Sequence, residues 1–168
     1  MFLVNDIYLV LEDGVGLTGR LGGVKVRPLE IENAVLGEGW ATNGGDTPIA
    51  TLSTSNLTPA TLTSKVMRSS TKGTDLVVDF KKPAVDDPIE YVEVDTFAFR
   101  DAATTTAIKT ALDDRGVKTT VKTTALPLDT MVGSAVNVAR LSLTPTGDRW
   151  SLDNVDSLKV VINSKAGG

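Results

Sequence analysis

Short apolar runs separated by turn-forming residues recur along most of the chain. In the clearest run, Ile89–Arg100, Val92 and Val94 fall on one face of an extended strand, and Glu93 and Asp95 fall on the other. Alternation with this period is typical of a half-buried β-strand, and no long stretch has the period of a helix. The pattern therefore predicts a protein built mainly from short strands.

About eight to ten such runs are bounded by Gly, Pro, Asn or Asp. The predicted strands are Phe2–Leu11, Val24–Arg27, Pro48–Ser53, Ala60–Ser69, Asp75–Lys81, Ile89–Arg100, Thr104–Leu112, Val117–Thr124, Ala135–Leu143 and Leu158–Ile162. Thr104–Leu112 is also compatible with a helix, although its run of threonines favours a strand. We expect an all-β fold, an antiparallel β-sandwich or jelly roll, with a short helical turn near the C-terminus.

Two local signals refine this expectation. The sequence Asp-Asp-Arg-Gly at 113–116 predicts a turn that makes Val117–Thr124 the hairpin partner of the preceding strand. Ser151–Ser157 begins with a helix N-cap residue, which predicts one or two helical turns. Trp150 stands directly before this helix and suits a plug at one end of the core, and Leu158–Ile162 then forms a last, buried strand.

Residues 1–35 differ in composition from the rest of the chain, because glycines are concentrated after Phe2–Leu11. Two interpretations are open: an N-terminal strand or arm that makes an inter-subunit contact, or two more strands of the same sandwich. We divide the chain into this segment, 1–35, and a β-sandwich domain, 36–168. The arm interpretation predicts that removing 1–35 abolishes assembly and leaves a folded monomer.

Composition restricts the possible classes of function more than it restricts the possible folds. The 168 residues are 41% hydrophobic and 23% charged, with a net charge of −4, as expected for one soluble domain without a basic footprint for nucleic acid or anionic membranes. Cysteine and histidine are absent, which excludes disulfides, Ser-His-Asp and Cys-His catalysis, and zinc or copper sites built on these residues. No stretch approaches the ~20 apolar residues of a membrane span.

Gly14, Gly16 and Gly19 spell the G-x-G-x-x-G pattern of dinucleotide-binding loops. That chemistry requires a helix whose amide groups meet the pyrophosphate, and the glycines and proline that follow prevent a helix here. We interpret the segment as a Gly-rich connection and expect no cofactor.

One acidic group could in principle serve a glycosidase or bind Ca²⁺. Its members are Asp86, Asp87, Glu90, Glu93 and Asp95. A solvated loop and strand end explains them better, because charge clusters usually face water and no Ca²⁺-loop pattern is present. A smaller polar group near the C-terminus is explained better by helix capping. It consists of Asp153, Asn154 and Asp156. We predict no catalytic and no metal-binding residues.

Aromatic and basic side chains suggest two kinds of binding. The rings that could stack on a sugar are Trp40, Trp150, Tyr8 and Tyr91, and a glycan-binding module requires an exposed ring at Trp40 or Tyr91. The basic residues around the predicted hairpin are Lys109, Arg115, Lys118 and Lys122. Acidic neighbours and the lack of interleaved aromatics favour a mixed-charge surface over a nucleic-acid site.

Three segments carry a family resemblance. In Met67–Val78 an Arg-Ser-Ser run and a Gly-Thr-Asp turn precede an apolar strand, Val92–Asp101 ends in Phe-Arg-Asp, and Trp150–Val161 joins Trp-Ser and an acidic helical turn to the last strand. In order and spacing these segments resemble small β-sandwich structural proteins of tailed-bacteriophage virions. The resemblance covers roughly residues 36–166, and it departs from the family where Met67 replaces the usual aromatic.

The resemblance implies a non-enzymatic virion component on the head, at the neck or collar, or in the tail, assembled in the host cytoplasm. Its partners would be capsid, neck or tail proteins and further copies of itself in a homo-oligomer, with neither nucleic acid nor membrane as a partner. No catalytic, cofactor or metal residues carry over. Two alternatives stay open: a glycan-binding β-sandwich module of the tail-fibre or receptor-binding type, and a carboxylate-dependent hydrolase using Glu93 and Asp95.

Overall fold

The computed structural model describes residues 2–11, 25–43, 45–53, 67–84, 88–98, 107–126 and 135–165. Within them the chain forms antiparallel strands and two short helices, which confirms the all-β class. The elements are β1 (Phe2–Leu11), β2 (Lys25–Pro28), β3 (Ile31–Leu36), β4 (Trp40–Thr42), α1 (Pro48–Leu52), β5 (Met67–Ser69), β6 (Asp75–Phe80), β7 (Ile89–Ala98), β8 (Ala107–Asp114), β9 (Val117–Ala125), β10 (Ala135–Leu141), α3 (Leu152–Ser157) and β11 (Leu158–Lys165).

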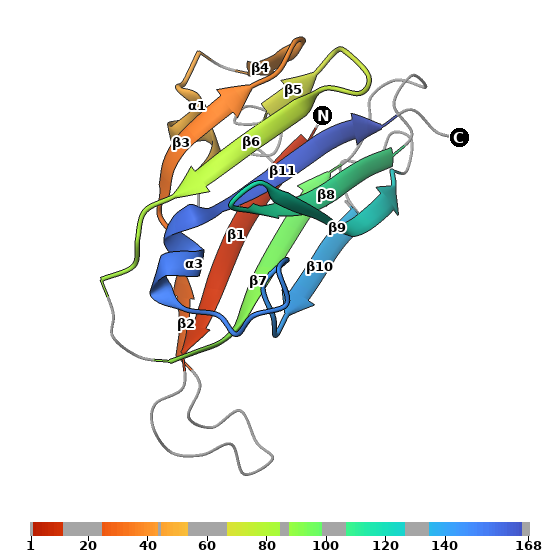
Figure 1. Ribbon diagram of the computed structural model, residues 1–168. Coiled ribbons are helices and arrows are strands. Elements are labelled where there is room, and N and C mark those ends of the chain that lie inside the picture. The colour runs from red at the N-terminus through yellow and green to blue at the C-terminus, as the bar shows by residue number, and fades with distance from the viewer. Residues whose placement is uncertain are drawn as a thin grey trace.

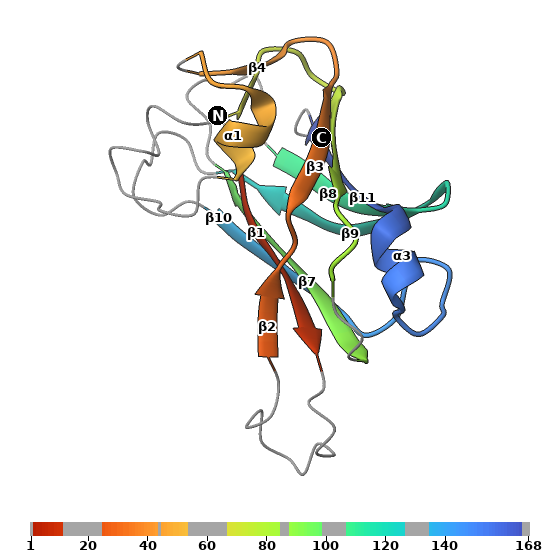
Figure 2. The same cartoon turned by 90° about the vertical axis from the view of Figure 1, so that its left-hand side faces the viewer.

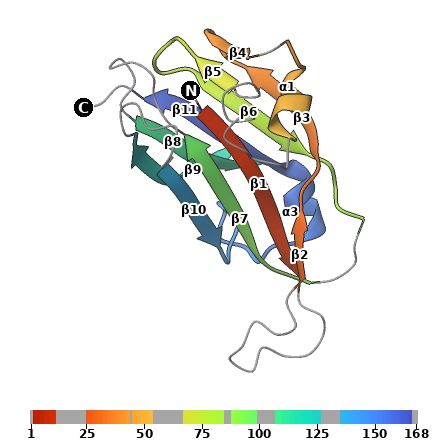
Figure 3. The same ribbon diagram turned by 180° about the vertical axis from the view of Figure 1, so that it is seen from behind.

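The strands form two sheets, which appear as separate layers in Figure 1 and Figure 2. A six-stranded sheet has the order β10-β7-β1-β5-β4, with β2 also paired to β1, and a five-stranded sheet has the order β3-β6-β11-β8-β9. Figure 3, seen from behind, shows β10, β7 and β1 side by side. The last strand, β11, occupies the centre of its sheet, so the prediction of a buried final strand is confirmed.

Strand β1 lies inside the six-stranded sheet. Its pairing with β7 runs from Phe2 opposite Ala98 to Leu11 opposite Ile89, and its other edge pairs with β5 at one end and β2 at the other. The register shifts between Val4 and Ile7, so a β-bulge coincides with the polar residues that interrupt the apolar run. The division of the chain at residue 36 and the role of 1–35 in an inter-subunit contact stay predictions.

One hydrophobic core draws side chains from both sheets. Alternate residues of β6 and β11, such as Val78 and Val160, are fully buried in the five-stranded sheet. Val92 and Val94 contribute from β7 of the other sheet and are also fully buried. Their burial confirms the inward face predicted for Ile89–Arg100.

Two adjacent crossovers connect the sheets at one end of the molecule. β3 leads into β4 of the other sheet, and β5 returns to β6. The crossovers lie against each other, since Gly37 N donates to Asp75 O at 2.8 Å and Ser70 N donates to Gly39 O at 2.9 Å. Gly39 has a φ of +77°, and a Cβ at this position would lie 2.2 Å from Thr71 Oγ1. Only glycine fits both the backbone conformation and the close approach.

A tryptophan closes each end of the core. Trp40 and Trp150 are each only 5% exposed as whole residues. The Trp40 indole donates to Thr74 O at 3.1 Å, and the Trp150 indole donates to Leu141 O at 2.8 Å. Each ring thus buries its apolar body and satisfies its polar N–H. The prediction that Trp150 is a core plug is confirmed.

The predicted hairpin and the predicted helix cap are both confirmed. Arg115 and Gly116 have φ of 52° and 88°, as in the type I′ turns that suit the twist of a two-strand hairpin, and they join β8 to β9. Gly116 N donates to Asp113 Oδ1 at 2.8 Å. At the start of α3, Asn154 N donates to the N-cap oxygen of Ser151 at 3.2 Å.

The prediction of a strand over Pro48–Ser53 is wrong. This segment contains α1, because Thr47 is an N-cap whose Oγ1 accepts from Ala50 N at 3.2 Å, and proline follows in the first helical turn. Strands β3 and β4 are missing from the prediction, since Glu and Asn residues in β3 obscure its alternation. The predicted strand Ala60–Ser69 is described only over its last residues, Met67–Ser69.

Candidate binding pocket

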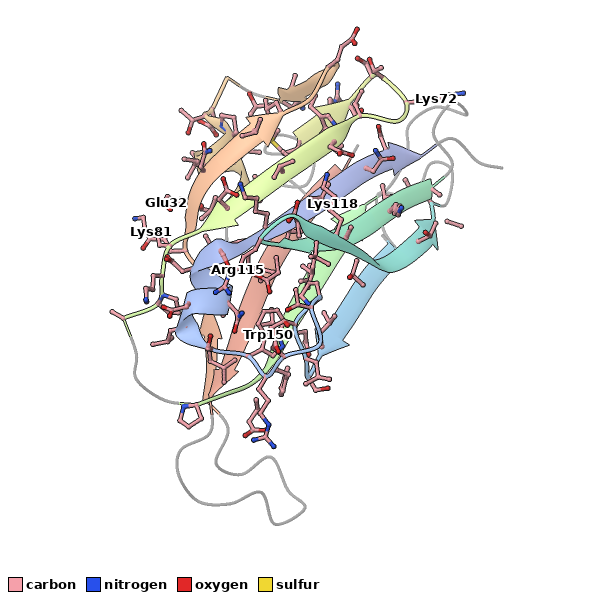
Figure 4. All side chains as sticks on the ribbon, in the orientation of Figure 1. Glu32, Lys72, Lys81, Arg115, Lys118 and Trp150 are labelled. Atoms are coloured by element: carbon pink, nitrogen blue, oxygen red, sulfur yellow. The ribbon has the colours of Figure 1, made fainter. Side chains whose placement is uncertain are left out.

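A pocket of about 660 Å³ opens at the end of the molecule that Trp150 closes. Its lining comes from the start of β7 and from the segment between β10 and α3. The lining residues are Pro88, Ile89, Glu90, Ser142, Leu143, Arg149 and Trp150. The volume lies within the range of roughly 300–1,000 Å³ that is usual for ligand-binding sites. Figure 4 shows Trp150 at the opposite end of the molecule from Lys72.

Strand β7 extends past the end of β10 beside this pocket. The ladder between β7 and β10 ends with Val92 opposite Leu141, whereas β7 itself begins at Ile89. On its other side, β1 pairs with Ile89 and Tyr91 and skips Glu90, which is the extra residue of a β-bulge. Among the strands that the structure describes, the ladder with β10 therefore does not extend along residues 89–91.

A turn over residues 143–149 forms the facing wall. Leu143 and Arg149 make an isolated antiparallel bridge, and Thr144 N donates to Asp148 O at 2.9 Å. Side chains reinforce the turn: Thr146 Oγ1 donates to Asp148 Oδ2 at 3.0 Å, and Asp148 N donates to Thr144 Oγ1 at 3.1 Å. These bonds fix the wall that carries Leu143 and Arg149.

The buried carboxylate of Asp114 joins this wall to the rest of the molecule. The residue is 0% exposed. Its Oδ1 accepts from Ser157 Oγ at 3.0 Å and its Oδ2 accepts from Thr146 Oγ1 at 3.4 Å. Arg115 Nε lies 3.9 Å from Oδ1, but its side chain is largely exposed, so water screens this pair. The pocket wall, α3 and the β8–β9 turn thus share one buried carboxylate.

The pocket combines apolar surface with two opposite charges. Leu143 is 47% exposed, a large fraction for an aliphatic side chain. Arg149 is exposed, and within the part of the chain that the structure describes it makes no ion pair; Glu90 is half-buried. The site can therefore accept an apolar group flanked by charges of both signs.

A surface ion pair lies at the start of α3, at residues outside the pocket lining. Lys82 Nζ donates to Asp153 Oδ1 at 2.7 Å. This hydrogen bond and the Lys82 ammonium charge lower the pKa of Asp153, and the same bond and the Asp153 carboxylate charge raise the pKa of Lys82. Both side chains are exposed, so the pair contributes little to stability.

The acidic residues singled out from the sequence have separate surroundings. Asp86, Asp87 and the side chain of Asp95 lie outside the described residues. Glu90 lines the pocket, whereas Glu93 is half-buried at a position opposite Arg140 of β10. Within the described ranges, no three His, Cys, Asp or Glu residues are grouped so that they could hold a metal ion.

The aromatic and basic residues are placed as follows. Trp40 is buried, so this ring offers no face to a sugar, and Tyr91 is half-buried. Lys118 Nζ lies 3.8 Å from Asp75 Oδ2 on the five-stranded sheet (Figure 4), so this base faces an acid. Lys109 is half-buried. The side chains of Tyr8 and Lys122, and Gly14, Gly16 and Gly19, lie outside the description.

Sequence reasoning missed the pocket. The predicted strand Ala135–Leu143 runs past the end of β10, which is Leu141, and so assigns Leu143 to a ladder that has already ended. The available signal was the turn sequence that begins at Pro145, which places Leu143 beside a reversal of the chain.

Comparison with protein-family models, with curated proteins and with solved structures finds no match to this chain. Among the described residues, no helix has the length and apolar character needed to cross a membrane.

Proposed function

We propose that this chain is a non-enzymatic structural protein of a tailed-phage virion, folded as a β-sandwich. It binds capsid, neck or tail proteins and further copies of itself. Two antiparallel sheets that share one core support the sandwich assignment. A rigid framework of this kind presents turns and strand edges as binding surfaces.

The observation that carries the proposal is the position of the three segments on which the resemblance rests. Met67–Val78 spans β5, a crossover and most of β6, and Val92–Asp101 includes most of β7. Trp150–Val161 spans the plug, α3 and half of β11. All three bury side chains in the same core, namely Met67, Leu76, Val78, Val92, Val94, Trp150, Val155, Leu158 and Val160. Segments that meet in one core are expected where a resemblance reflects shared architecture.

Mass photometry of the full chain tests the proposal, first alone and then with capsids, necks or tails of the phage that encodes it. A discrete ring-sized oligomer supports a neck or tail component. A monomer, dimer or trimer that binds only to assembled capsids supports a head-decorating role. A chain that stays monomeric and binds none of these particles contradicts the proposal.

Glycan binding is the alternative, and one observation favours it: Trp150 lines an open pocket. The residue as a whole is only 5% exposed, which leaves little ring surface for stacking on a sugar. Tryptophan fluorescence with a panel of oligosaccharides tests this alternative. A saturable response would favour it, and no response to any sugar would count against it.

A further inference from the structure

We infer that β3 is a docking edge for a second copy of this chain. Two β3 strands would pair antiparallel about a two-fold axis, with Val35 of one copy opposite Val35 of the other. The inference deepens the proposed function, because it locates a self-contact of a protein proposed to bind further copies of itself. The dimer can be measured on the purified chain without any virion, so the two ideas are tested separately.

The first argument is the position of β3 at the end of its sheet. The strand order is β3-β6-β11-β8-β9, and within the described residues β3 pairs with β6 alone. Figure 2 looks onto this edge of the molecule, with α1 beside β3 on the side of the six-stranded sheet. The N–H and C=O groups along the outer side of such a strand are a template for another strand.

The second argument is the direction of the backbone groups. Gly37 N donates to Asp75 O at 2.8 Å, so the backbone of Gly37 faces β6. In an antiparallel ladder, residues two apart face the same side and their neighbours face the other. The register with β6 is continuous up to this point. Val35 therefore also faces β6 with its backbone, and the N–H and C=O groups of Ala34 and Leu36 point out of the sheet edge.

These directions select one symmetric register. Ala34 of each copy would lie opposite Leu36 of the other, and each of these two hydrogen-bonded pairs forms two N–H···O=C bonds. Val35 then meets its counterpart at the centre as a non-hydrogen-bonded pair, the arrangement in which side chains lie closest. Glu32 lies beyond the end of the opposite strand, because β3 ends at Leu36, so its charge stays in water.

The third argument is the apolar surface beside the edge. Val35 is 54% exposed, because its side chain points to the outer face of the sheet, whereas Ala34 and Leu36 pack against the core. Ile49 of α1 is 37% exposed, and α1 contacts β3. A second β3 would cover Val35 with an identical side chain and would lie beside Ile49, so apolar area leaves water when the dimer forms.

The fourth argument is that β3 lacks the features that keep strand edges from associating. Edges are commonly protected by a very short strand, by Pro or by Lys. In this structure β4 has only three residues, and β9 carries the exposed Lys118. β3 has six residues without Pro or Lys, and its register shift lies at its start, before Asn33. Of these three strands, β3 is therefore the one suited to pairing with a copy of itself.

The experiment measures self-association of the full chain by sedimentation velocity from about 5 to about 500 µM, because a small interface dissociates in this range. Two variants change the centre of the predicted contact, Val35→Asp and Val35→Lys, and they are measured alone and as an equimolar mixture. The matched controls are Val117→Asp and Val117→Lys, at a residue that is 46% exposed on β9. Thermal unfolding verifies that each variant is folded.

We expect the native chain to form a dimer as its concentration rises. Each Val35 variant alone should dimerise at least about tenfold more weakly, because two like charges would face each other at the centre. The mixture of Val35→Asp and Val35→Lys should recover the dimer, since opposite charges then meet. The Val117 variants should dimerise as the native chain does.

Hydrogen exchange measured by NMR separates strand pairing from a contact of side chains alone. At about 500 µM, the amides of Ala34 and Leu36 should exchange at least about tenfold more slowly in the native chain than in Val35→Asp, because only the native dimer bonds them. The amide of Gly37 is the internal control. It is bonded to Asp75 in each copy and should be protected equally in both proteins.

Three results would overturn the inference: a native chain that is monomeric at about 500 µM, Val35 variants that self-associate as the native chain does, or equal exchange of the Ala34 and Leu36 amides in the native chain and Val35→Asp. None of these bears on whether the chain is part of a virion. Conversely, a chain that dimerises through β3 and is absent from virions would contradict the proposed function alone.

Discussion

Asp114 illustrates how a single buried residue organises the region around the pocket. Its carboxylate accepts hydrogen bonds from Ser157 and Thr146, which belong to different segments. Asp114→Ala should lower the free energy of unfolding by about 2–3 kcal/mol, because two hydroxyl groups each lose one acceptor, the link between their segments is broken, and a cavity replaces the carboxylate. Urea denaturation measures the change. The control, Asp156→Ala at an exposed position, should change the free energy of unfolding by no more than about 0.5 kcal/mol. Equal effects of the two substitutions would show that the buried hydrogen bonds of Asp114 do not stabilise the fold.

Gly39 and Gly73 form a matched pair for separating two costs of replacing glycine. Both have positive φ, +77° and +76°, but a Cβ at Gly39 meets Thr71 Oγ1 at 2.2 Å, whereas nothing lies within 4 Å of one at Gly73. Gly73→Ala should cost about 1–2 kcal/mol for the left-handed backbone alone. Gly39→Ala should cost more, since the crossovers must also move apart, by about another 1–3 kcal/mol. Similar melting temperatures for the two variants would show that the crossovers can move apart at little cost in free energy.

At the scale of elements, the β8–β9 turn carries a residue that does not suit it. Arg115 adopts a φ of 52°, and type I′ turns favour Asn followed by Gly. Arg115→Asn should therefore stabilise the protein by about 0.5–1 kcal/mol, because Asn tolerates this conformation better and the long contact from the exposed Arg115 side chain to Asp114 contributes little. Arg115→Val is the opposite control and should destabilise. The thermal midpoints of the three proteins provide the measurement, and a lower midpoint for the Asn variant would contradict this account of the turn.

Local signals predicted the elements that local chemistry determines. Asp-Asp-Arg-Gly indicated the β8–β9 turn, Ser151 indicated α3, and the alternation around Val92 indicated β7. The segment after Thr47 was misassigned because its residue pattern, including Pro48, fits a short strand as well as a capped helix. β3 was missed because its Glu and Asn residues interrupt the alternation of apolar and polar positions that marks a strand.

The pocket could not be predicted for a different reason. It arises where the pairing of β7 with β10 stops at Leu141, and the end of a ladder depends on contacts between segments far apart in sequence. Glu90 was identified only as part of an acidic group, whereas its position follows from a bulge opposite β1. Arg149 and Leu143 carry no local signal of binding, since their juxtaposition with β7 is purely tertiary.

At the scale of the whole molecule, residues 1–35 test how the sheets depend on each other. β1 pairs with β7 along one edge and with β2 and β5 along the other, so deleting 1–35 removes an internal strand together with β2 and most of β3. We expect the truncated chain to lose its cooperative unfolding transition, because β7 would lose its hydrogen-bonded neighbour within the sheet and β6 would lose most of its pairing with β3. Circular dichroism during heating measures this. A truncated chain that melts cooperatively as a monomer would instead favour the arm interpretation.

The central claim is that this chain is a structural component of a phage particle. Quantitative mass spectrometry of gradient-purified particles from the phage that encodes it tests this claim most directly, with the major capsid protein as the internal reference. We predict that the chain co-purifies with the particles at a fixed ratio to the capsid protein, and that this ratio survives repeated purification. Particles that contain the capsid protein in full amount but none of this chain would contradict the claim.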